Sequence, residues 1–393
     1  MKILDIFRPD TKQNSQTETN SASNSCLVTP SLGISPAKLR GKLRDYLKKR
    51  RPAFRLIYGL RALREGMRGL ILRKRGSGDH LKSSVSLLLG GERVLGRPMN
   101  VTIEPTNACN LGCPICETGA KVLGRPTGHM SLNNFQIIMD KIAPHTNTLM
   151  FYFMGEPFLN KDAYDMIRYA KSKGIPFITT CTNGDFANGE KVVKSGIDEV
   201  SFQIGGMTQE THQIYRINSN LARVIGNLKE TIRWKNEQHS KIRIASGFIL
   251  MKHNEHEVEL FLKTMKDLGV DSAVVIDPCV RTHEEGLQYL PTDENHWYYD
   301  PQAFKTGVLK PRFLPPNECP WIYYSLSIHV NGSVVPCCRD PLGKHIMGNL
   351  LTESLDEIWN GVKYREFRKQ LHSDQGQINI CRLCSSYSPS PIQ

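Results

Sequence analysis

Three cysteines lie within eight residues of one another, at positions 109, 113 and 116 of the segment ACNLGCPICETG (108–119). Thiolates are soft ligands that suit zinc or iron–sulfur clusters. A structural zinc site takes four protein ligands, which usually come from separated pairs. Three thiolates on one loop can instead hold three irons of a cubane, whose fourth iron keeps an open, reactive position. The spacing of Cys109, Cys113 and Cys116 therefore favours an iron–sulfur cluster over zinc or incidental cysteines.

A second group of cysteines lies toward the C-terminal end, at positions 319, 337, 338, 381 and 384. Four thiolates in a tetrahedral array suit zinc as well as a cluster, so both remain open. Either Cys337 or Cys338 could be the ligand from the adjacent pair. Cys181 and Cys279 stand alone, and isolated cysteines are most often small buried hydrophobes.

The elements that must position the first cysteine loop alternate along the middle of the chain. Strand-like runs lie at 100–105, 148–154, 176–181, 199–204, 242–250 and 272–277, with helical stretches at about 131–143, 161–173, 188–195, 220–238 and 254–268. Strands joined by crossover helices are parallel neighbours with right-handed connections. We therefore predict an α/β core over 98–278, most economically a partial (β/α)6 TIM-like barrel. The cysteine loop then follows the first strand, at the carboxyl ends where such domains bind ligands.

The alternation stops after about residue 278. The segment SLSIHVNGSVVPCC (325–338) predicts a hairpin that turns at Asn331 and Gly332. Two helical pieces, TESLDEIWN and KYREFRKQL, follow before the last cysteine pair. We predict a small cysteine-rich C-terminal domain over 279–393.

The N-terminal region differs in composition from the rest of the chain. Residues 1–35 are rich in Ser, Thr, Asn and Gln, which predicts a disordered tail. Residues 36–97 predict a basic, amphipathic helical extension with a helix break at Pro52 and a linker at Gly76–Asp79.

The basic extension points to particular partners. Sixteen of the 51 Lys and Arg residues lie in 36–82, against three acids, and the rest of the chain carries 35 of each sign. Apolar residues recur at helical spacing beside arginines 61, 64 and 68, and this stripe consists of Leu56, Leu60, Leu63, Met67 and Leu70. Such a helix can contact an anionic membrane through 36–82, or it can pack on the barrel with one face and leave the other face in solvent. Because the excess positive charge is confined to this extension and is not spread over the chain, the pattern argues against a nucleic-acid partner.

Two absences bear on the compartment. No apolar run of about 18 residues could span a membrane, and the N-terminal segment lacks the apolar core of a signal peptide. We therefore predict a cytoplasmic protein that can associate with a membrane surface.

With these elements in place, the chain resembles the radical S-adenosylmethionine (SAM) superfamily, whose Cys-x3-Cys-x2-Cys loop is matched by Cys109, Cys113 and Cys116. The resemblance spans about 98–277. It implies a 4Fe–4S cluster whose open iron binds the amino and carboxylate groups of SAM. It also implies a low-potential electron donor, such as flavodoxin or ferredoxin, whose electron splits SAM to a 5′-deoxyadenosyl radical.

The same resemblance implies a set of cofactor-binding residues in the segments FMGEPFLN, TTCTNG, VSFQIGG and YRIN. They are Glu156 near the methionyl amino group, Thr180 and Asn183 close to the cofactor, and Gln203 and Arg216 near the ribose and the methionyl carboxylate. Two positions depart from the family pattern. Ile115 stands where an aromatic residue is usual, and Gln203 where serine is frequent.

The C-terminal cysteines resemble the SPASM-type extension of this superfamily. Cys319 is followed after twelve residues by Gly332 and after four more by Cys337, and Cys381-x2-Cys384 completes a set of four. The full pattern has more cysteines and holds two auxiliary clusters. The resemblance therefore implies one auxiliary 4Fe–4S cluster here.

These features predict a radical SAM enzyme that abstracts hydrogen from an organic substrate and oxidises a small-molecule or lipid-linked biosynthetic intermediate. One alternative is a ribosomal peptide maturase or epimerase, although residues 1–97 lack the strand and winged-helix pattern of a leader-binding domain. The other is a non-catalytic metal-binding module that holds an anionic partner.

Two candidate catalytic residues, Asp277 and Cys279, lie at the end of the sixth strand-like run. The Cys279 thiol could return a hydrogen atom to a substrate radical, which would give epimerisation. Loss of an electron to the auxiliary cluster would instead give oxidation, which we favour, and Asp277 could take the released proton.

Overall fold

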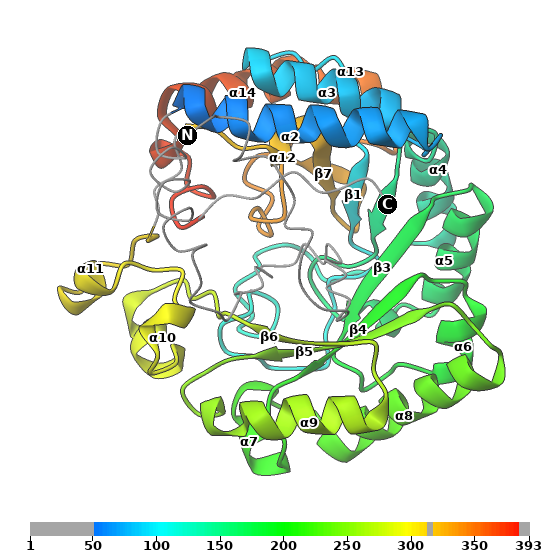
Figure 1. The fold of residues 1–393 in the computed structure, drawn as a ribbon, viewed down its shortest axis with the longest axis vertical. Coiled ribbons are helices and arrows are strands. Elements are labelled where there is room, and N and C mark those ends of the chain that lie inside the picture. The colour runs from blue at the N-terminus through cyan, green and yellow to red at the C-terminus, as the bar shows by residue number, and fades with distance from the viewer. Residues whose placement is uncertain (1–50, 313–316, 385–393) are drawn as a thin grey trace, which may run out of the picture.

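The computed structural model describes residues 51–312 and 317–384, with side chains described from Arg55 onward (Figure 1). The predicted disordered tail at 1–35 and the first part of the basic extension, 36–50, lie outside the described residues.

The described strands form one continuous nine-stranded sheet in the order β6-β5-β4-β3-β2-β1-β7-β8-β9. The first six strands are parallel to their neighbours. Their bounds are β1 Asn100–Ile103, β2 Thr148–Met150, β3 Phe177–Thr182, β4 Glu199–Ile204, β5 Arg243–Ile249 and β6 Ser272–Ile276. All six coincide with predicted runs, so the parallel α/β prediction is confirmed.

The crossover helices lie along the outside of this curved sheet (Figure 1). They are α4 Leu132–Ile142, α5 Ala163–Ser172, α6 Gly189–Lys194, α7 Gln209–Tyr215, α8 Leu221–Glu237 and α9 Val258–Leu268. Side chains of Ser131, Asn188 and Asn220 accept hydrogen bonds from the first turns of α4, α6 and α8. Gly269 ends α9 with a positive φ of 79°. Helix α7 was not predicted, because seven residues are too few for a periodic pattern.

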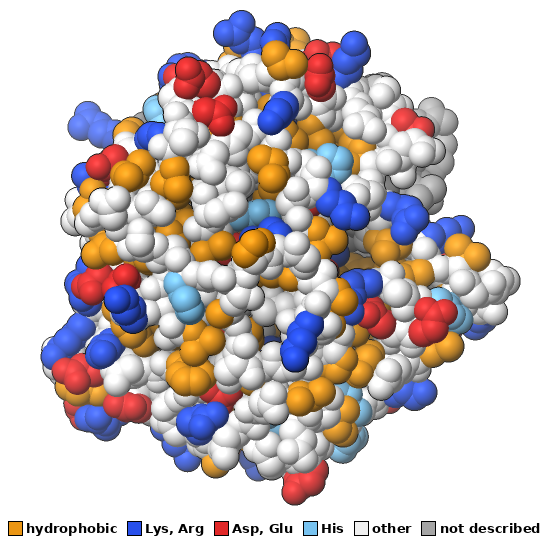
Figure 2. Space-filling view, turned by 180° about the vertical axis from the view of Figure 1, so that it is seen from behind, with side chains coloured by type: hydrophobic (Ala, Val, Ile, Leu, Met, Phe, Trp, Pro, Cys, Tyr) orange, Lys and Arg blue, Asp and Glu red, His pale blue; other side chains and the backbone are white. Residues whose placement is uncertain are grey.

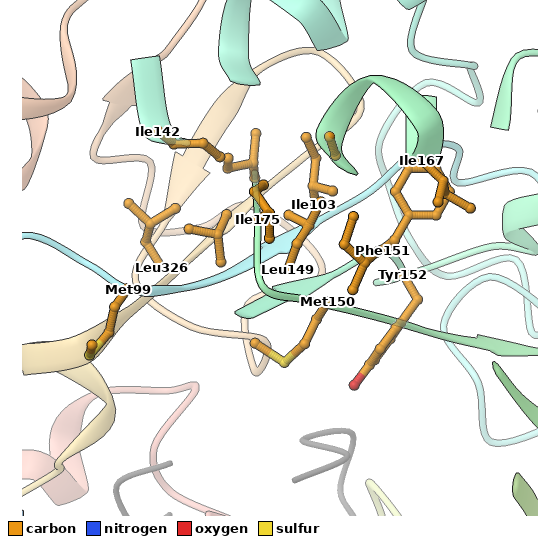
Figure 3. Close-up of a cluster of buried hydrophobic side chains, with 14 of the residues drawn as sticks. Met99, Ile103, Ile142, Leu149, Met150, Phe151, Tyr152, Ile167, Ile175 and Leu326 are labelled. Atoms are coloured by element: carbon orange, nitrogen blue, oxygen red, sulfur yellow. The ribbon is translucent and has the colours of Figure 1, made fainter. Parts of the chain in front are cut away.

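The predicted hairpin forms, and its first strand joins the barrel sheet. Strand β7 (Ser325–Ile328) pairs in parallel with all four residues of β1, and β8 (Ser333–Val335) pairs antiparallel with β7. Strand β9 (Gly348–Asn349) follows β8. The side chain of Leu326 in β7 is fully buried in the same hydrophobic cluster as Leu149 and Ile142 from the barrel (Figure 3). The cysteine-rich region and the barrel therefore share one sheet and one core.

The remaining C-terminal elements are short. They are α10 His283–Tyr289, α11 Pro301–Lys305, α12 Trp321–Tyr324, α13 Leu355–Trp359 and α14 Val362–Asp374. Helices α13 and α14 correspond to the two predicted helical pieces. Ser354 and Glu357 form a reciprocal capping box at the start of α13.

The N-terminal extension forms two helices, α2 (Arg51–Ile71) and α3 (Ser77–Leu89), which lie side by side along one edge of the molecule (Figure 1). Pro52 lies in the first turn of α2, where proline is tolerated. The predicted linker at Gly76–Asp79 is wrong. Gly76, with a φ of 77°, makes the turn, and Asp79 lies in the first turn of α3, where a carboxylate is favoured. No helix in the described residues is long and apolar enough to cross a membrane.

Candidate active site

A cavity of about 660 Å³ lies at the carboxyl ends of the parallel strands. Its wall includes the loop after β1, the ends of β2 to β6, and two C-terminal groups of residues, Cys338–Leu342 with Lys344, and Asn379, Ile380, Arg382 and Leu383. The volume is typical of sites that hold small molecules or cofactors. The cavity therefore lies between the two cysteine-bearing parts of the chain.

Cys109, Cys113 and Cys116 all line this cavity. The loop that carries them is fixed by its backbone, since the N–H of Gly112 donates to the carbonyl of Ile217 (3.0 Å). The pKa of the Cys109 thiol is raised to about 12, mainly by burial and in smaller part by the nearby Glu156, Cys113 and Cys116. The three thiols therefore lie close enough to interact.

The donor chemistry of this loop fits an iron–sulfur cluster. Within 51–312 and 317–384, no three His, Cys, Asp or Glu side chains converge as ligands of a single metal ion do. Three soft thiols instead line one cavity, and the guanidinium of Arg216 hydrogen-bonds the sulfur of Cys113. Burial acts to lower the pKa of Arg216, but Cys113 and Tyr215 outweigh it and the pKa is raised.

Glu156 follows β2 and is almost completely buried, at 2% exposure. Its carboxylate accepts hydrogen bonds from Thr182 Oγ1 (2.7 Å) and from the Asn183 N–H (2.7 Å). Its own N–H donates to the carbonyl of Ala108 in the cysteine loop (2.8 Å). Burial raises the pKa of Glu156 to about 7. A carboxylate at the cavity wall is thus held directly beside the cysteine loop.

Gly155, the residue before Glu156, allows this close approach. Its φ is 78°, and a Cβ there would lie 2.6 Å from the carbonyl oxygens of Thr106 and Ala108. No other residue type fits this turn without moving the cysteine loop.

The residues predicted at the end of β3 divide between two roles. Asn183 lines the cavity, and its Nδ2 donates to Asn110 Oδ1 (2.8 Å) and faces Cys109 Sγ at 3.9 Å. Thr180 does not line the cavity, because its hydroxyl donates to the carbonyl of Phe151 between strands (2.8 Å). Thr182, which sequence reasoning missed, lines the cavity and holds Glu156. Sequence reasoning could have found Thr182 from its position as the last residue of the strand.

Gln203 also lines the cavity. Its Nε2 donates to Ser201 Oγ (2.8 Å), and a Cβ on Gly247 in the neighbouring strand would lie 2.6 Å from its Oε1. The Gln203 amide therefore packs over Gly247, which has no side chain to block it.

Asp277 and Cys279 follow β6 and both line the cavity. The Asp277 carboxylate lies 2.8 Å from His296 Nδ1. Burial raises the pKa of Asp277, whereas the hydrogen bond with His296 acts to lower it. Sequence reasoning missed His296, which comes from a segment without periodic pattern.

Arg339 connects Cys279 with the C-terminal cysteines. Its Nη2 lies 3.6 Å from the sulfur of Cys279, and its backbone N–H donates to the sulfur of Cys337 (3.3 Å).

The C-terminal set gathers four of its five thiols in one buried place. Burial is the main cause that raises the pKa values of Cys319 and Cys337; Cys338 also raises that of Cys337, and Cys381 and Cys384 act to raise both. Cys338 lines the cavity, whereas Cys337 does not. Cys337 therefore interacts with Cys381 and Cys384 as well as with its neighbour Cys338.

A buried ion pair ties the cysteine loop to the C-terminal region. Both oxygens of Glu104, directly after β1, accept from the guanidinium of Arg125 (2.7 and 2.8 Å). Glu104 also accepts from the N–H of Val330 (2.9 Å), and Arg125 donates to the carbonyl of Pro341 (2.6 Å). The pair thus fixes the loop against the segment that carries Cys338 and Arg339.

Comparison with known families agrees with this site. Residues 103–265 match the model of the radical SAM superfamily, and residues 319–385 match the SPASM model, described as an iron–sulfur cluster-binding domain. The chain therefore belongs to the radical SAM superfamily and carries a SPASM domain, which confirms the predicted resemblance. Its cofactors are SAM and 4Fe–4S iron–sulfur clusters, and the SPASM match favours a cluster over zinc in the C-terminal set.

Relatives with described functions are varied. The chain is 26% identical to the AdoMet-dependent heme synthase of Methanosarcina barkeri, over 72% of this chain and 88% of that protein. It is 23% identical to the tungsten-containing aldehyde ferredoxin oxidoreductase cofactor-modifying protein of Pyrococcus furiosus, over 68% of this chain and 82% of that protein.

Among solved structures, Streptococcus suis SuiB bound to its precursor peptide SuiA shares the fold. The TM-score is 0.54 at 13% identity, and the match covers 81% of this chain and 80% of that one.

Proposed function

We propose that this enzyme abstracts a hydrogen atom from an organic substrate in the cavity and oxidises a small-molecule or lipid-linked biosynthetic intermediate. The observation that carries the proposal is that one cavity is lined by the first cysteine set and by residues adjoining the second. Such an arrangement suits a substrate radical that forms beside one cluster and loses an electron to another.

Bound SAM, once reduced, supplies the 5′-deoxyadenosyl radical. The roles proposed for this chain are binding and orientation. Glu156 accepts the methionyl amino group, and the bonds from Thr182 and Asn183 keep its carboxylate aimed at the cysteine loop. Arg216 balances negative charge at the thiolates and at the methionyl carboxylate. Gln203 lies on the cavity wall in reach of the remainder of the cofactor.

The oxidation balances as the loss of two electrons and two protons from substrate. Hydrogen-atom abstraction removes one of each and leaves a substrate radical. An auxiliary cluster held by Cys319, Cys337, Cys381 and Cys384 would take up the second electron, and Asp277, beside His296, would accept the second proton.

The alternative outcome is epimerisation, in which Cys279 returns a hydrogen atom. The contact of Cys279 with Arg339, beside the second cysteine set, makes its thiol part of the same wall. In this alternative the substrate would be a peptide, and the similarly folded SuiB was solved with a bound precursor peptide.

Two further partners complete the proposal. A low-potential carrier such as flavodoxin or ferredoxin supplies the first electron. The basic extension, of which the structure describes 51–82, contacts an anionic membrane.

The test is anaerobic reconstitution followed by incubation with deuterated candidate substrates. Deuterium that appears in 5′-deoxyadenosine identifies the substrate, and product two hydrogens lighter supports oxidation. Solvent deuterium gained at carbon by the parent enzyme, and lost in Cys279→Ala, would replace oxidation by epimerisation. A colourless protein that binds zinc and leaves SAM intact would contradict the enzyme proposal altogether.

A further inference from the structure

Helix α2 packs on α3 through a face of small residues. Tyr58, Gly59, Ala62 and Gly66 are buried there. A Cβ on Gly59 would lie 2.4 Å from Leu88 Cδ2, and one on Gly66 would lie 3.0 Å from His80 Nδ1. The two glycines therefore let α3 approach closely. This face of α2, which carries the glycines, attaches the helix to the rest of the protein.

Four of the five residues of the leucine stripe predicted from the sequence are exposed on a different side of α2, and the fifth, Leu63, is half-buried. Leu56, Leu60, Met67 and Leu70 are 56%, 42%, 56% and 46% exposed, and Ile71 extends the stripe at 78%. A stripe that packed on the barrel would be buried. Within the described residues, α2 instead packs on the protein with another face, as the alternative to membrane contact expected, and most of the stripe faces solvent.

Positive charge runs along one side of this stripe. Arg61, Arg64 and Arg68 each directly follow a stripe residue, so all three lie on the same flank of the helix. Glu65 is the one acid in α2. The face of the molecule seen from behind differs, because there hydrophobic side chains are scattered among charges of both signs (Figure 2).

We propose that α2 lies flat in the headgroup layer of an anionic bilayer, with the stripe Leu56, Leu60, Met67, Leu70 and Ile71 entering the acyl boundary and the arginine flank contacting lipid phosphates. This deepens the membrane contact of the proposed function by naming the face that makes it. An acidic protein partner would account for the arginines but not for the exposed apolar stripe. A row of five exposed aliphatic side chains beside them matches the boundary between headgroups and hydrocarbon.

The junction between α2 and α3 lies away from the active-site cavity. At the α2–α3 junction, the carbonyl of Arg75 accepts from Asn147, directly before β2, and its guanidinium donates to the carbonyl of Lys173, before β3. This junction is therefore fixed at the amino ends of the strands, whereas the cavity lies at their carboxyl ends.

The experiment is sedimentation of the full-length, reconstituted protein with two kinds of vesicle, phosphatidylcholine alone and phosphatidylcholine mixed with phosphatidylglycerol. We expect binding to the mixed vesicles only, weakened by added salt. Arg61→Gln, Arg64→Gln and Arg68→Gln together should weaken binding on the order of 100-fold, since each charge near an anionic surface contributes about fivefold. Leu56→Gln, Leu60→Gln, Met67→Gln and Leu70→Gln together should abolish it.

A matched control is available on α9, where Leu260 and Leu262 are 50% and 40% exposed. Leu260→Gln and Leu262→Gln should leave sedimentation unchanged. SAM cleavage is measured on every variant and should stay at the parent rate, so a failure of the enzyme chemistry would be seen separately from a failure of membrane binding. Parent protein that ignores both vesicles, or a stripe variant that binds like the parent, would overturn the inference. So would binding of an acidic electron carrier, but of no vesicle, to the arginine flank.

Discussion

The buried pair Glu104–Arg125 offers a quantitative test, because it joins the cysteine loop to the C-terminal region. The Glu104 side chain is fully buried, and that of Arg125 is 13% exposed. Arg125→Met keeps the aliphatic volume but leaves the Glu104 carboxylate buried without its counter-charge. Removing one partner of a buried pair costs about 3–5 kcal/mol.

This cost should appear in thermal unfolding of the reconstituted enzyme under anaerobic conditions. At roughly 2.1 cal/mol/K of unfolding entropy per residue, the described part of the chain should lose about 4–7 °C in Tm. SAM cleavage should fall as well, because Cys109 lies only five residues after Glu104.

The chain contains its own control, the pair Arg97–Asp356, whose side chains are 39% and 62% exposed. Its two hydrogen bonds are as short as those of the buried pair, at 2.7 Å. Arg97→Met should nevertheless cost under about 1 kcal/mol, since solvent screens an exposed pair. The double variant Glu104→Leu with Arg125→Met should recover part of the loss. The reasoning fails if Arg125→Met costs no more than Arg97→Met, or if the double variant is merely additive.

Three further predictions concern the site. Cys116→Ala should abolish 5′-deoxyadenosine formation and remove about four irons per chain, because no neighbouring side chain can replace the lost thiolate; a variant that still cleaves SAM would contradict the loop assignment. Cys337→Ala should remove about four irons and stop product formation while SAM cleavage partly persists, whereas Cys338→Ala should keep its iron; the reverse result would exchange their roles. Thr182→Val should raise the Km for SAM by about tenfold, since a hydrogen bond to a charged group contributes roughly 1.5–3 kcal/mol, and should be mimicked by Glu156→Gln; an unchanged Km would remove the proposed positioning role.

The alternating strands and helices of the barrel could be predicted from the sequence, because buried parallel strands are short apolar runs that are visible in the local sequence pattern. The six strands and the turn at Gly332 all lie where expected. The pairing of β7 with β1 could not be predicted, since it joins residues about 225 positions apart and leaves no local signal. Cys109 and Glu156 could be predicted because they lie in motifs that resemble those of the superfamily. The role of His296 could not be predicted, because only tertiary packing brings it beside Asp277.

The pairing of β1 with β7 has a consequence for the modularity of this protein. The two family models match separate segments of the chain, 103–265 and 319–385, yet the ladder between β1 and β7 joins the barrel to the C-terminal domain. A chain truncated after residue 278 would expose the N–H and C=O groups of β1 along Asn100–Ile103, and an exposed strand edge recruits other chains. The same truncation would remove Leu326 from the core. Exchange of the C-terminal domain between relatives, by recombination or by design, would therefore have to carry a β7 that matches the recipient's first strand.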